Sequence, residues 1–184
     1  MHKLMAGCGL ISGHESVFTP RGPLYNLWDD YDVESSWMAA PHLNSDPACS
    51  CTIVHLVRHP VKVINSFLAL DFYNKETAYT AYLNSHIDLS QHANEIDRAC
   101  HHYISWNKMI SESLSRCNNY LLFRLEDNPQ HLLQDLGLSG PNFADKRYNS
   151  RAATDSDKTI RERIAASQLE LQLTQYAGEL GYTL

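Results

Sequence analysis

The order of hydrophobic and polar positions along the chain predicts alternating strands and helices. Residues 51–57, CTIVHLV, form an almost unbroken apolar run that follows the turn-forming segment NSDPACS, which favours a buried strand of a parallel sheet. Residues 119–125, NYLLFRL, are a second run of this kind. Residues 33–40, VESSWMAA, read as a shorter strand that ends before Pro41.

Helical spacing is clearest in two long segments. A helix is predicted over about 90–116, where apolar residues recur near every third or fourth position: Ile96, Cys100, Tyr103, Ile104, Trp106 and Ile110. A closing helix is predicted over about 157–181, with four residues facing inward: Ile160, Ile164, Leu171 and Tyr176. The N-terminal HKLMAGCGL resembles the second half of an amphipathic helix that ends at Gly13.

Two shorter helices carry end signals. Pro60 follows the strand at 51–57 almost at once and suits the first position of a helix, where its missing N–H costs nothing. Asn128 fits an N-cap, Pro129 the first helical position and Gly137 the position just past the end. We therefore predict one α/β domain over residues 1–184, with a parallel sheet covered by helices.

Composition narrows the class of protein. The chain has 184 residues, of which 43% are hydrophobic and 20% charged, as in an ordinary soluble domain. Its net charge of −6 argues against a nucleic-acid partner, and no run approaches the roughly 18 apolar residues that span a membrane, so we expect a cytoplasmic protein. The number of cysteines is odd, which favours a reducing compartment over a disulfide framework: Cys8, Cys49, Cys51, Cys100 and Cys117. The ten histidines are scattered, so no metal site is predicted.

Arg58 and Ser66 are the first candidates for a binding site. Ligands of open parallel sheets bind at the carboxyl ends of the strands, which is where Arg58 lies. Ser66 follows about two turns into the next helix, and arginine, backbone amides and a hydroxyl together suit a phosphate group. A surface salt bridge of Arg58 and an incidental Ser66 fit the spacing equally well.

The segment IVHLVRHPVKVINSF, residues 53–67, resembles the strand–Arg-x-Pro–helix–Ser element of sulfotransferases that use 3′-phosphoadenosine 5′-phosphosulfate. Five further segments resemble parts of that family in the same order: GLISGHESVF, ESSWMAAPHL, YLLFRLEDNPQHLLQDLGLS, RYNSR and ELGY. The resemblance implies a P-loop-NTPase-like, three-layer α/β/α fold. It also implies transfer of a sulfuryl group from the nucleotide to a hydroxyl or amine, without a metal.

The same resemblance suggests roles for single residues. Arg58 and Ser66 fall on positions that bind the 3′-phosphate, and Arg151 in the RYNSR segment reaches the same phosphate. Glu15 falls on the position of the catalytic base, with His14 and His42 as weaker candidates. The acceptor is expected to be a small molecule or a glycan, bound in a pocket shaped by the region 70–95.

Several departures from the family leave alternatives open. His59 replaces the usual Asp or Asn N-cap, and Leu125 stands where an aromatic residue is common. No segment matches the family's first strand and its Gly-Thr-Thr loop for the 5′-phosphosulfate. Either the true start lies upstream or the chain is an N-terminally truncated relative, and we expect the given chain to be inactive or nearly so by itself.

Two other functions compete with this reading. LVRHP also resembles the Arg-His-Gly strand end of histidine phosphatases, with His59 as nucleophile. A non-catalytic fragment that binds nucleotide or another protein is the second alternative.

Overall fold

The strands of the protein pair two by two. The computed structural model describes residues 1–44, 50–114, 117, 119–140 and 155–184. Within these residues the strands form three two-stranded sheets: β1 (Ser12–His14) parallel to β4 (Val33–Ser35), β2 (Phe18–Thr19) antiparallel to β3 (Gly22–Pro23), and β5 (Ile53–Val57) parallel to β6 (Tyr120–Arg124).

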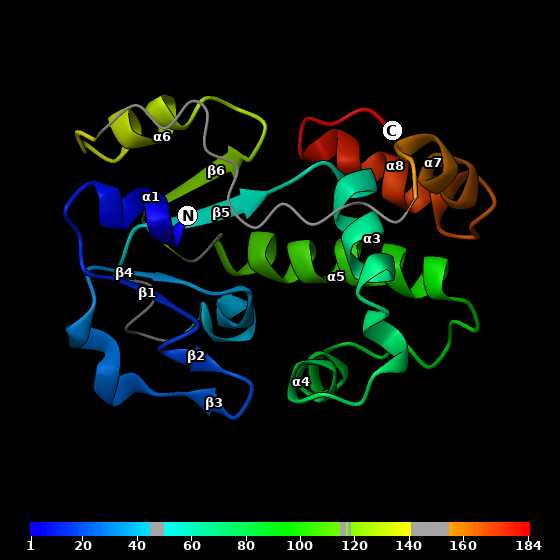
Figure 1. Cartoon of the computed structure of the whole chain (residues 1–184), viewed down its shortest axis with the longest axis horizontal. Coiled ribbons are helices and arrows are strands. Elements are labelled where there is room, and N and C mark those ends of the chain that lie inside the picture. The colour runs from blue at the N-terminus through cyan, green and yellow to red at the C-terminus, as the bar shows by residue number, and fades with distance from the viewer. Residues whose placement is uncertain (45–49, 115–116, 118, 141–154) are drawn as a thin grey trace.

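Helices make up most of the remaining described structure. The α-helices are α1 (His2–Gly7), α3 (Pro60–Ala69), α4 (Ala78–His86), α5 (Glu95–Leu114), α6 (Pro129–Asp135), α7 (Asp157–Ala165) and α8 (Glu170–Glu179). Shorter 3₁₀ helices are η1 (Tyr25–Asp30), η2 (Trp37–His42) and η3 (Phe72–Asn74). Figure 1 shows α3, α4, α5, α7 and α8 gathered on one side of the molecule and β1 to β4 on the other. None of the helices in the described ranges has both the length and the apolarity to cross a membrane.

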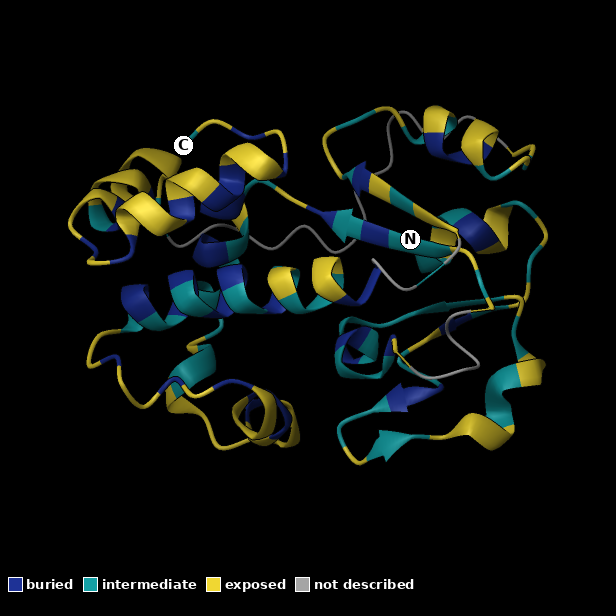
Figure 2. Cartoon of the chain, turned by 180° about the vertical axis from the view of Figure 1, so that it is seen from behind, coloured by how far each residue is buried: buried dark blue, intermediate teal, exposed yellow. Residues whose placement is uncertain are grey.

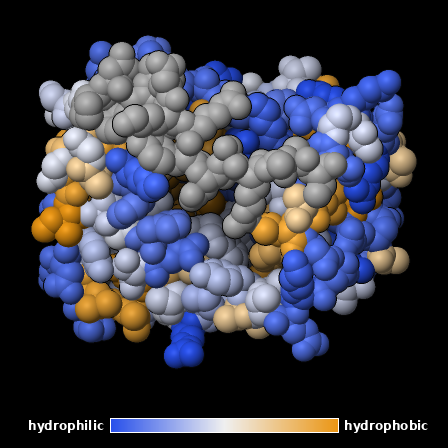
Figure 3. Space-filling view, in the orientation of Figure 1, coloured by the Kyte–Doolittle hydropathy of each residue, from blue (hydrophilic) through white to orange (hydrophobic). Residues whose placement is uncertain are grey.

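Three clusters of buried side chains hold these elements together. The largest lies between β5, α3, α5, α7 and α8, where Ile64, Ile160 and Leu173 are fully buried. A second joins the N-terminal strands and η2 to α4 and α5 through Met38 and Trp106, and a third packs α1 and α6 against β5 and β6. The exposed residues of α7 and α8 lie away from this core (Figure 2). On the face shown in Figure 3, apolar residues reach the surface in separate areas divided by polar ones.

The predicted strands at 51–57 and 119–125 are confirmed as β5 and β6, and they pair in parallel as expected. The long helix is confirmed over a shorter span as α5. The end signals of α6 are also confirmed, because the Asn128 side chain accepts the N–H of Gln130 at 3.0 Å and Gly137 has a φ of +66°. The chain is thus mixed α/β with parallel pairing, although its described strands form separate pairs instead of one continuous sheet.

Two predicted elements at the N-terminal side are wrong. The first helix ends at Gly7 and not at Gly13, because Gly9 takes a φ of +86° and turns the chain into β1. The predicted strand at 33–40 stops at Ser35. The Ser36 side chain accepts the N–H of Met38 at 3.2 Å and starts η2 instead, since a serine side chain offers the backbone this local alternative to a strand ladder.

The predicted closing helix at 157–181 is two helices. The Ser167 hydroxyl accepts the N–H of Leu169 at 3.0 Å and hydrogen-bonds to Asp97 of α5, which holds a turn between α7 and α8. This turn changes the direction of the buried face. Ile160, Ile164 and Tyr176 are buried as predicted, whereas Leu171 is 75% exposed.

Candidate functional site

Arg58 lies where the sequence pattern suggested, between β5 and α3. β5 ends at Val57, and Pro60 is the first residue of α3. The Arg58 carbonyl accepts the Tyr103 hydroxyl at 3.0 Å. Its side chain is exposed, and the guanidinium makes no hydrogen bond or ion pair with any described residue. Arg58 therefore presents a charge that is available to an anionic ligand.

His59 takes the capping role that Asp or Asn usually fills. Its Nδ1 accepts the N–H of Val61 at 3.3 Å, so Nε2 carries the proton and donates to the Thr183 carbonyl at 3.1 Å. Its backbone N–H donates to Glu126 at 3.1 Å. Both ring nitrogens are thus engaged, and this arrangement does not favour His59 as a phosphatase nucleophile. The cap also means that α3 offers fewer free amides to an anion than the pattern suggested.

Gly181 and Tyr182 hydrogen-bond to residues at the carboxyl end of β6. Tyr182 donates its hydroxyl to Glu126 at 2.8 Å, and burial together with this carboxylate raises the pKa of Tyr182. Arg124 donates to both carboxylate oxygens of Asp127, at 3.0 and 3.1 Å, and to the Gly181 carbonyl at 2.9 Å. A Cβ on Gly181 would lie 2.9 Å from Arg124 Nη1, so glycine permits this approach. Glu126 and Asp127 thus have structural roles at this strand end.

Ser66 lies on α3, roughly 9 Å along the helix axis from Pro60 at the usual rise per residue. It is half-buried. Its neighbour Asn65 is 4% exposed and donates to the Asp155 carbonyl at 2.8 Å, and its Oδ1 has no hydrogen-bond partner in the part of the chain that the structure describes. The Arg58 side chain would have to fold back along the first turn to share an anion with Ser66, and this arrangement stays a prediction. Arg151 lies outside the described residues.

Glu15 occupies a strained turn at the carboxyl end of β1. Its φ is +56°, a left-handed conformation that costs a non-glycine residue about 1–2 kcal/mol. Its N–H donates to the Ser35 carbonyl at 3.2 Å, and its carboxylate accepts the hydroxyl of Tyr79 from α4 at 2.9 Å. The hydrogen bond and the negative charge of Glu15 both raise the pKa of Tyr79. The chain thus positions this carboxylate from two elements.

His14 and His42 are held differently. His14 is exposed and its Nδ1 donates to the Ser35 carbonyl at 2.9 Å, which leaves Nε2 available. His42 stacks on Phe18 at 5.7 Å, and its Nε2 lies 3.1 Å from the Tyr82 hydroxyl. Burial, and secondarily His86, lowers the pKa of His42. Among described residues no hydrogen bond, ion pair or ring contact directly joins the Glu15 turn to His42, Arg58 or Ser66.

Glu34 is a further candidate site residue, which the sequence analysis did not identify. It pairs with Gly13 across β1 and β4, and its Oε1 accepts the N–H of Ser16 at 2.8 Å. Its Oε2 is buried and has no hydrogen-bond partner within the described ranges. A Cβ at Gly13 would lie 2.1 Å from that oxygen, so glycine makes room for the carboxylate. A glycine inside a short strand was the signal that another group approaches closely.

The described residues contain no cluster of three or more histidine, cysteine, aspartate or glutamate side chains arranged to hold a metal ion. Comparison of the chain with protein-family models, with curated proteins and with solved structures found no match.

Proposed function

We propose that this chain is a sulfotransferase domain of the type that uses 3′-phosphoadenosine 5′-phosphosulfate, built on a three-layer α/β/α fold. Arg58, Ser66 and Arg151 bind the 3′-phosphate of the nucleotide, and Glu15 is the catalytic base. The observation that carries the proposal is the exposed guanidinium of Arg58, unpaired among described residues, between β5 and the first turn of α3.

Charge supports this choice of ligand. The chain has a net charge of −6, so a guanidinium left without an acidic partner at a strand end is a specific feature and not part of a general basic surface. Arginine is suited to phosphate because its planar group donates two parallel hydrogen bonds.

The chemistry assigns one step to Glu15. The acceptor hydroxyl or amine attacks the sulfur in line, its proton passes to the Glu15 carboxylate, and the bond between sulfur and the 5′-phosphate oxygen breaks. Adenosine 3′,5′-bisphosphate leaves with the bonding electron pair, and the acceptor leaves sulfated. The Tyr79 hydroxyl donates a hydrogen bond to the Glu15 carboxylate and holds it in place between catalytic cycles.

Nucleotide binding is the first test. Adenosine 3′,5′-bisphosphate at about 100 times its Kd should stabilise the fold by about 2.7 kcal/mol, which raises the Tm of a chain this size by roughly 5–10 °C. Adenosine 5′-monophosphate, which lacks the 3′-phosphate, should raise it far less. Arg58→Ala should remove most of the shift, whereas Arg21→Ala, which removes another exposed arginine, should not. Equal shifts with both nucleotides would contradict the assignment.

A transfer assay separates the enzyme from the non-catalytic alternative. With labelled sulfate donor and a panel of hydroxyl and amine acceptors, only slow turnover is expected, because no segment matches the family's 5′-phosphosulfate loop. Sulfated product that disappears in Glu15→Gln supports the proposed base. Binding of the bisphosphate without any product would favour a nucleotide-binding fragment.

A further inference from the structure

A cavity of about 460 Å³ is lined mostly by residues of the region 70–95, which the family resemblance expected to shape the acceptor pocket. Its walls come from η3, α4, the loop at 87–92 and the first turns of α5. None of Glu15, His14, Arg58 or Ser66 lines it. Cavities that bind small molecules have volumes of about 300–1,000 Å³, so this one is large enough for an organic ligand.

The floor and one wall of the cavity are apolar and rigid. Leu83, Ile87 and Leu89 are buried beneath it. The wall is the ring of Tyr73, whose hydroxyl lies 3.1 Å from His102 Nδ1. The Tyr73 ring is held by edge-to-face contacts with Phe72 and Phe67, whose ring centroids lie 5.4 and 6.2 Å from its own. A fixed aromatic ring beside aliphatic side chains suits the C–H surface of a ring-shaped ligand.

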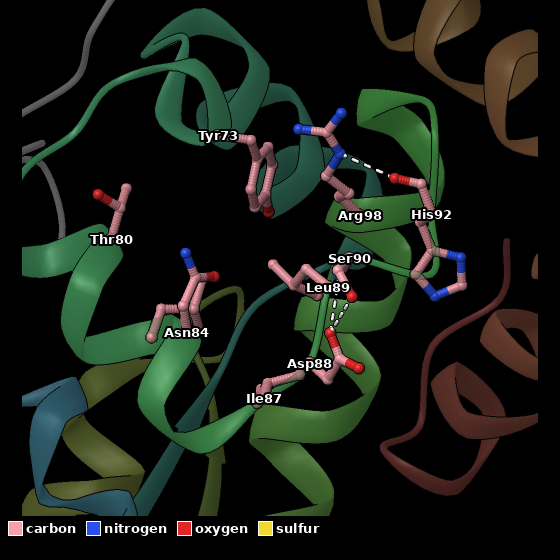
Figure 4. A pocket seen from close by; sticks show the side chains of 10 residues that line it. Tyr73, Thr80, Asn84, Ile87, Asp88, Leu89, Ser90, His92 and Arg98 are labelled. Atoms are coloured by element: carbon pink, nitrogen blue, oxygen red, sulfur yellow. Dashed lines mark hydrogen bonds between the residues drawn. The ribbon is translucent and has the colours of Figure 1, made fainter.

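Polar groups with unused hydrogen-bonding capacity complete the lining (Figure 4). The Arg98 guanidinium is anchored by Nε to the His92 carbonyl at 3.1 Å and by Nη2 to the Ala93 carbonyl at 3.0 Å, and its Nη1 has no partner among described residues. The Asn84 side-chain amide is exposed and makes no hydrogen bond with the described chain. The His92 ring points away from the cavity (Figure 4).

Asp88 balances the charge of Arg98. One of its carboxylate oxygens accepts the N–H and hydroxyl of Ser90, at 2.9 and 2.6 Å, and these bonds lower the pKa of Asp88. The other oxygen accepts no hydrogen bond from the described residues. The lining thus carries one positive and one negative group, which disfavours a strongly charged ligand, and it offers both donors and acceptors.

We infer that this cavity binds a neutral, polyhydroxylated ring molecule, that is, a mono- or disaccharide. Tyr73 packs against the C–H face of the sugar, and Asn84, Asp88 and Arg98 hydrogen-bond to its hydroxyl groups. The Nε and Nη2 groups of Arg98 already donate to carbonyls, so the ligand hydroxyls are bound by Nη1 and the remaining N–H of Nη2. The negative charge of Asp88 in the same lining is what disfavours an acidic ligand. The inference does not depend on sulfuryl transfer, since it requires neither nucleotide nor Arg58.

The test is a titration of the ¹⁵N-labelled protein, followed by NMR, with methyl glucoside, methyl galactoside, maltose and lactose. The zwitterion glycine and inorganic sulfate serve as charged probes of similar or smaller size. At least one sugar should shift amide signals in a saturable way, with the changes confined to residues 73–98. Absence of any shift up to the solubility limit of the sugars overturns the inference, as does binding of glycine or sulfate in their place.

Matched variants locate the contact. Asn84→Ala should weaken the affinity for sugar by roughly tenfold, because the amide's hydrogen bonds to the ligand are lost. Asn26→Ala removes an equally exposed asparagine that does not line the cavity and should leave the affinity unchanged. Asn84 makes no hydrogen bond to the described chain, so its loss should not unfold the protein. Equal affinities in the two variants would overturn the proposed site.

Discussion

The carboxyl ends of the two parallel strand pairs are held in different ways. At the end of β5 and β6, Glu126 accepts from His59 and Tyr182, and Arg124 pairs with Asp127, so polar groups are largely matched to one another. At the end of β1 and β4, Glu15 has a left-handed backbone, and one buried carboxylate oxygen of Glu34 is unpaired among the residues that the structure describes.

This difference separates two physical tasks. The first end joins distant segments of the chain by several hydrogen bonds and leaves only Arg58 unengaged there among the groups described. The second end keeps strain and a poorly compensated charge, which folded chains retain most often where function requires them. The first end is therefore expected to govern stability, and the second to tolerate or even gain from substitution.

The largest expected effect concerns acid stability. Burial, with a smaller contribution from His101, lowers the pKa of His102 from 6.5 to about 3. Below pH 6.5 the unfolded chain takes up a proton at this residue and the folded chain does not, so the free energy of unfolding should fall by about 1.4 kcal/mol per pH unit until the pH nears the folded pKa. His102→Phe keeps the stacking on Phe67, seen at 4.4 Å, and should flatten this slope.

Urea unfolding at several pH values measures the slope of the unfolding free energy against pH. The slope is the informative quantity, because His102→Phe also removes the partner of the Tyr73 hydroxyl and so lowers stability at every pH. His131→Gln, at an exposed histidine, is the control and should retain the wild-type slope. Identical slopes in wild type and His102→Phe would mean that other histidines carry the acid sensitivity, since burial also lowers the pKa of His42, His55, His86 and His101.

A smaller effect is expected at the matched strand end. Glu126→Ala leaves the His59 N–H and the Tyr182 hydroxyl without their acceptor and should cost about 1–3 kcal/mol in the free energy of unfolding. Glu76→Ala, at an exposed glutamate with no hydrogen bond to the described chain, should change it by about 0.5 kcal/mol or less. Chemical denaturation compares the two, and equal effects would mean that the C-terminal residues do not brace this end.

The smallest expected effect is at the strained end. Glu15→Ala keeps the strained φ of +56° without the carboxylate, whereas Glu15→Gly also relieves the strain. The glycine variant should be more stable than the alanine variant by about 1 kcal/mol, measured by thermal unfolding. If the Glu15→Ala variant is as stable as the Glu15→Gly variant, the turn is not strained and the contrast between the two strand ends disappears.

Elements with a strong local pattern were predictable from sequence. β5 and β6 are continuous apolar runs, and α6 is bounded by Asn128, Pro129 and Gly137, whose preferences act within a few residues. The same locality explains the correct placement of Arg58 between β5 and α3, because a strand end followed by proline leaves few alternatives.

Features that depend on distant partners were not predictable. The break between α7 and α8 requires Asp97 of α5 to meet Ser167, and the buried Oε2 atom of Glu34 requires Gly13 to lie opposite it on another strand. The cavity lies in the region 70–95, where the family resemblance placed the acceptor pocket, but its volume and lining depend on how η3, α4 and α5 pack together. Local preferences are set by each residue's own backbone and neighbours, whereas pairing, burial and unmatched polar atoms arise only when remote segments exclude water together.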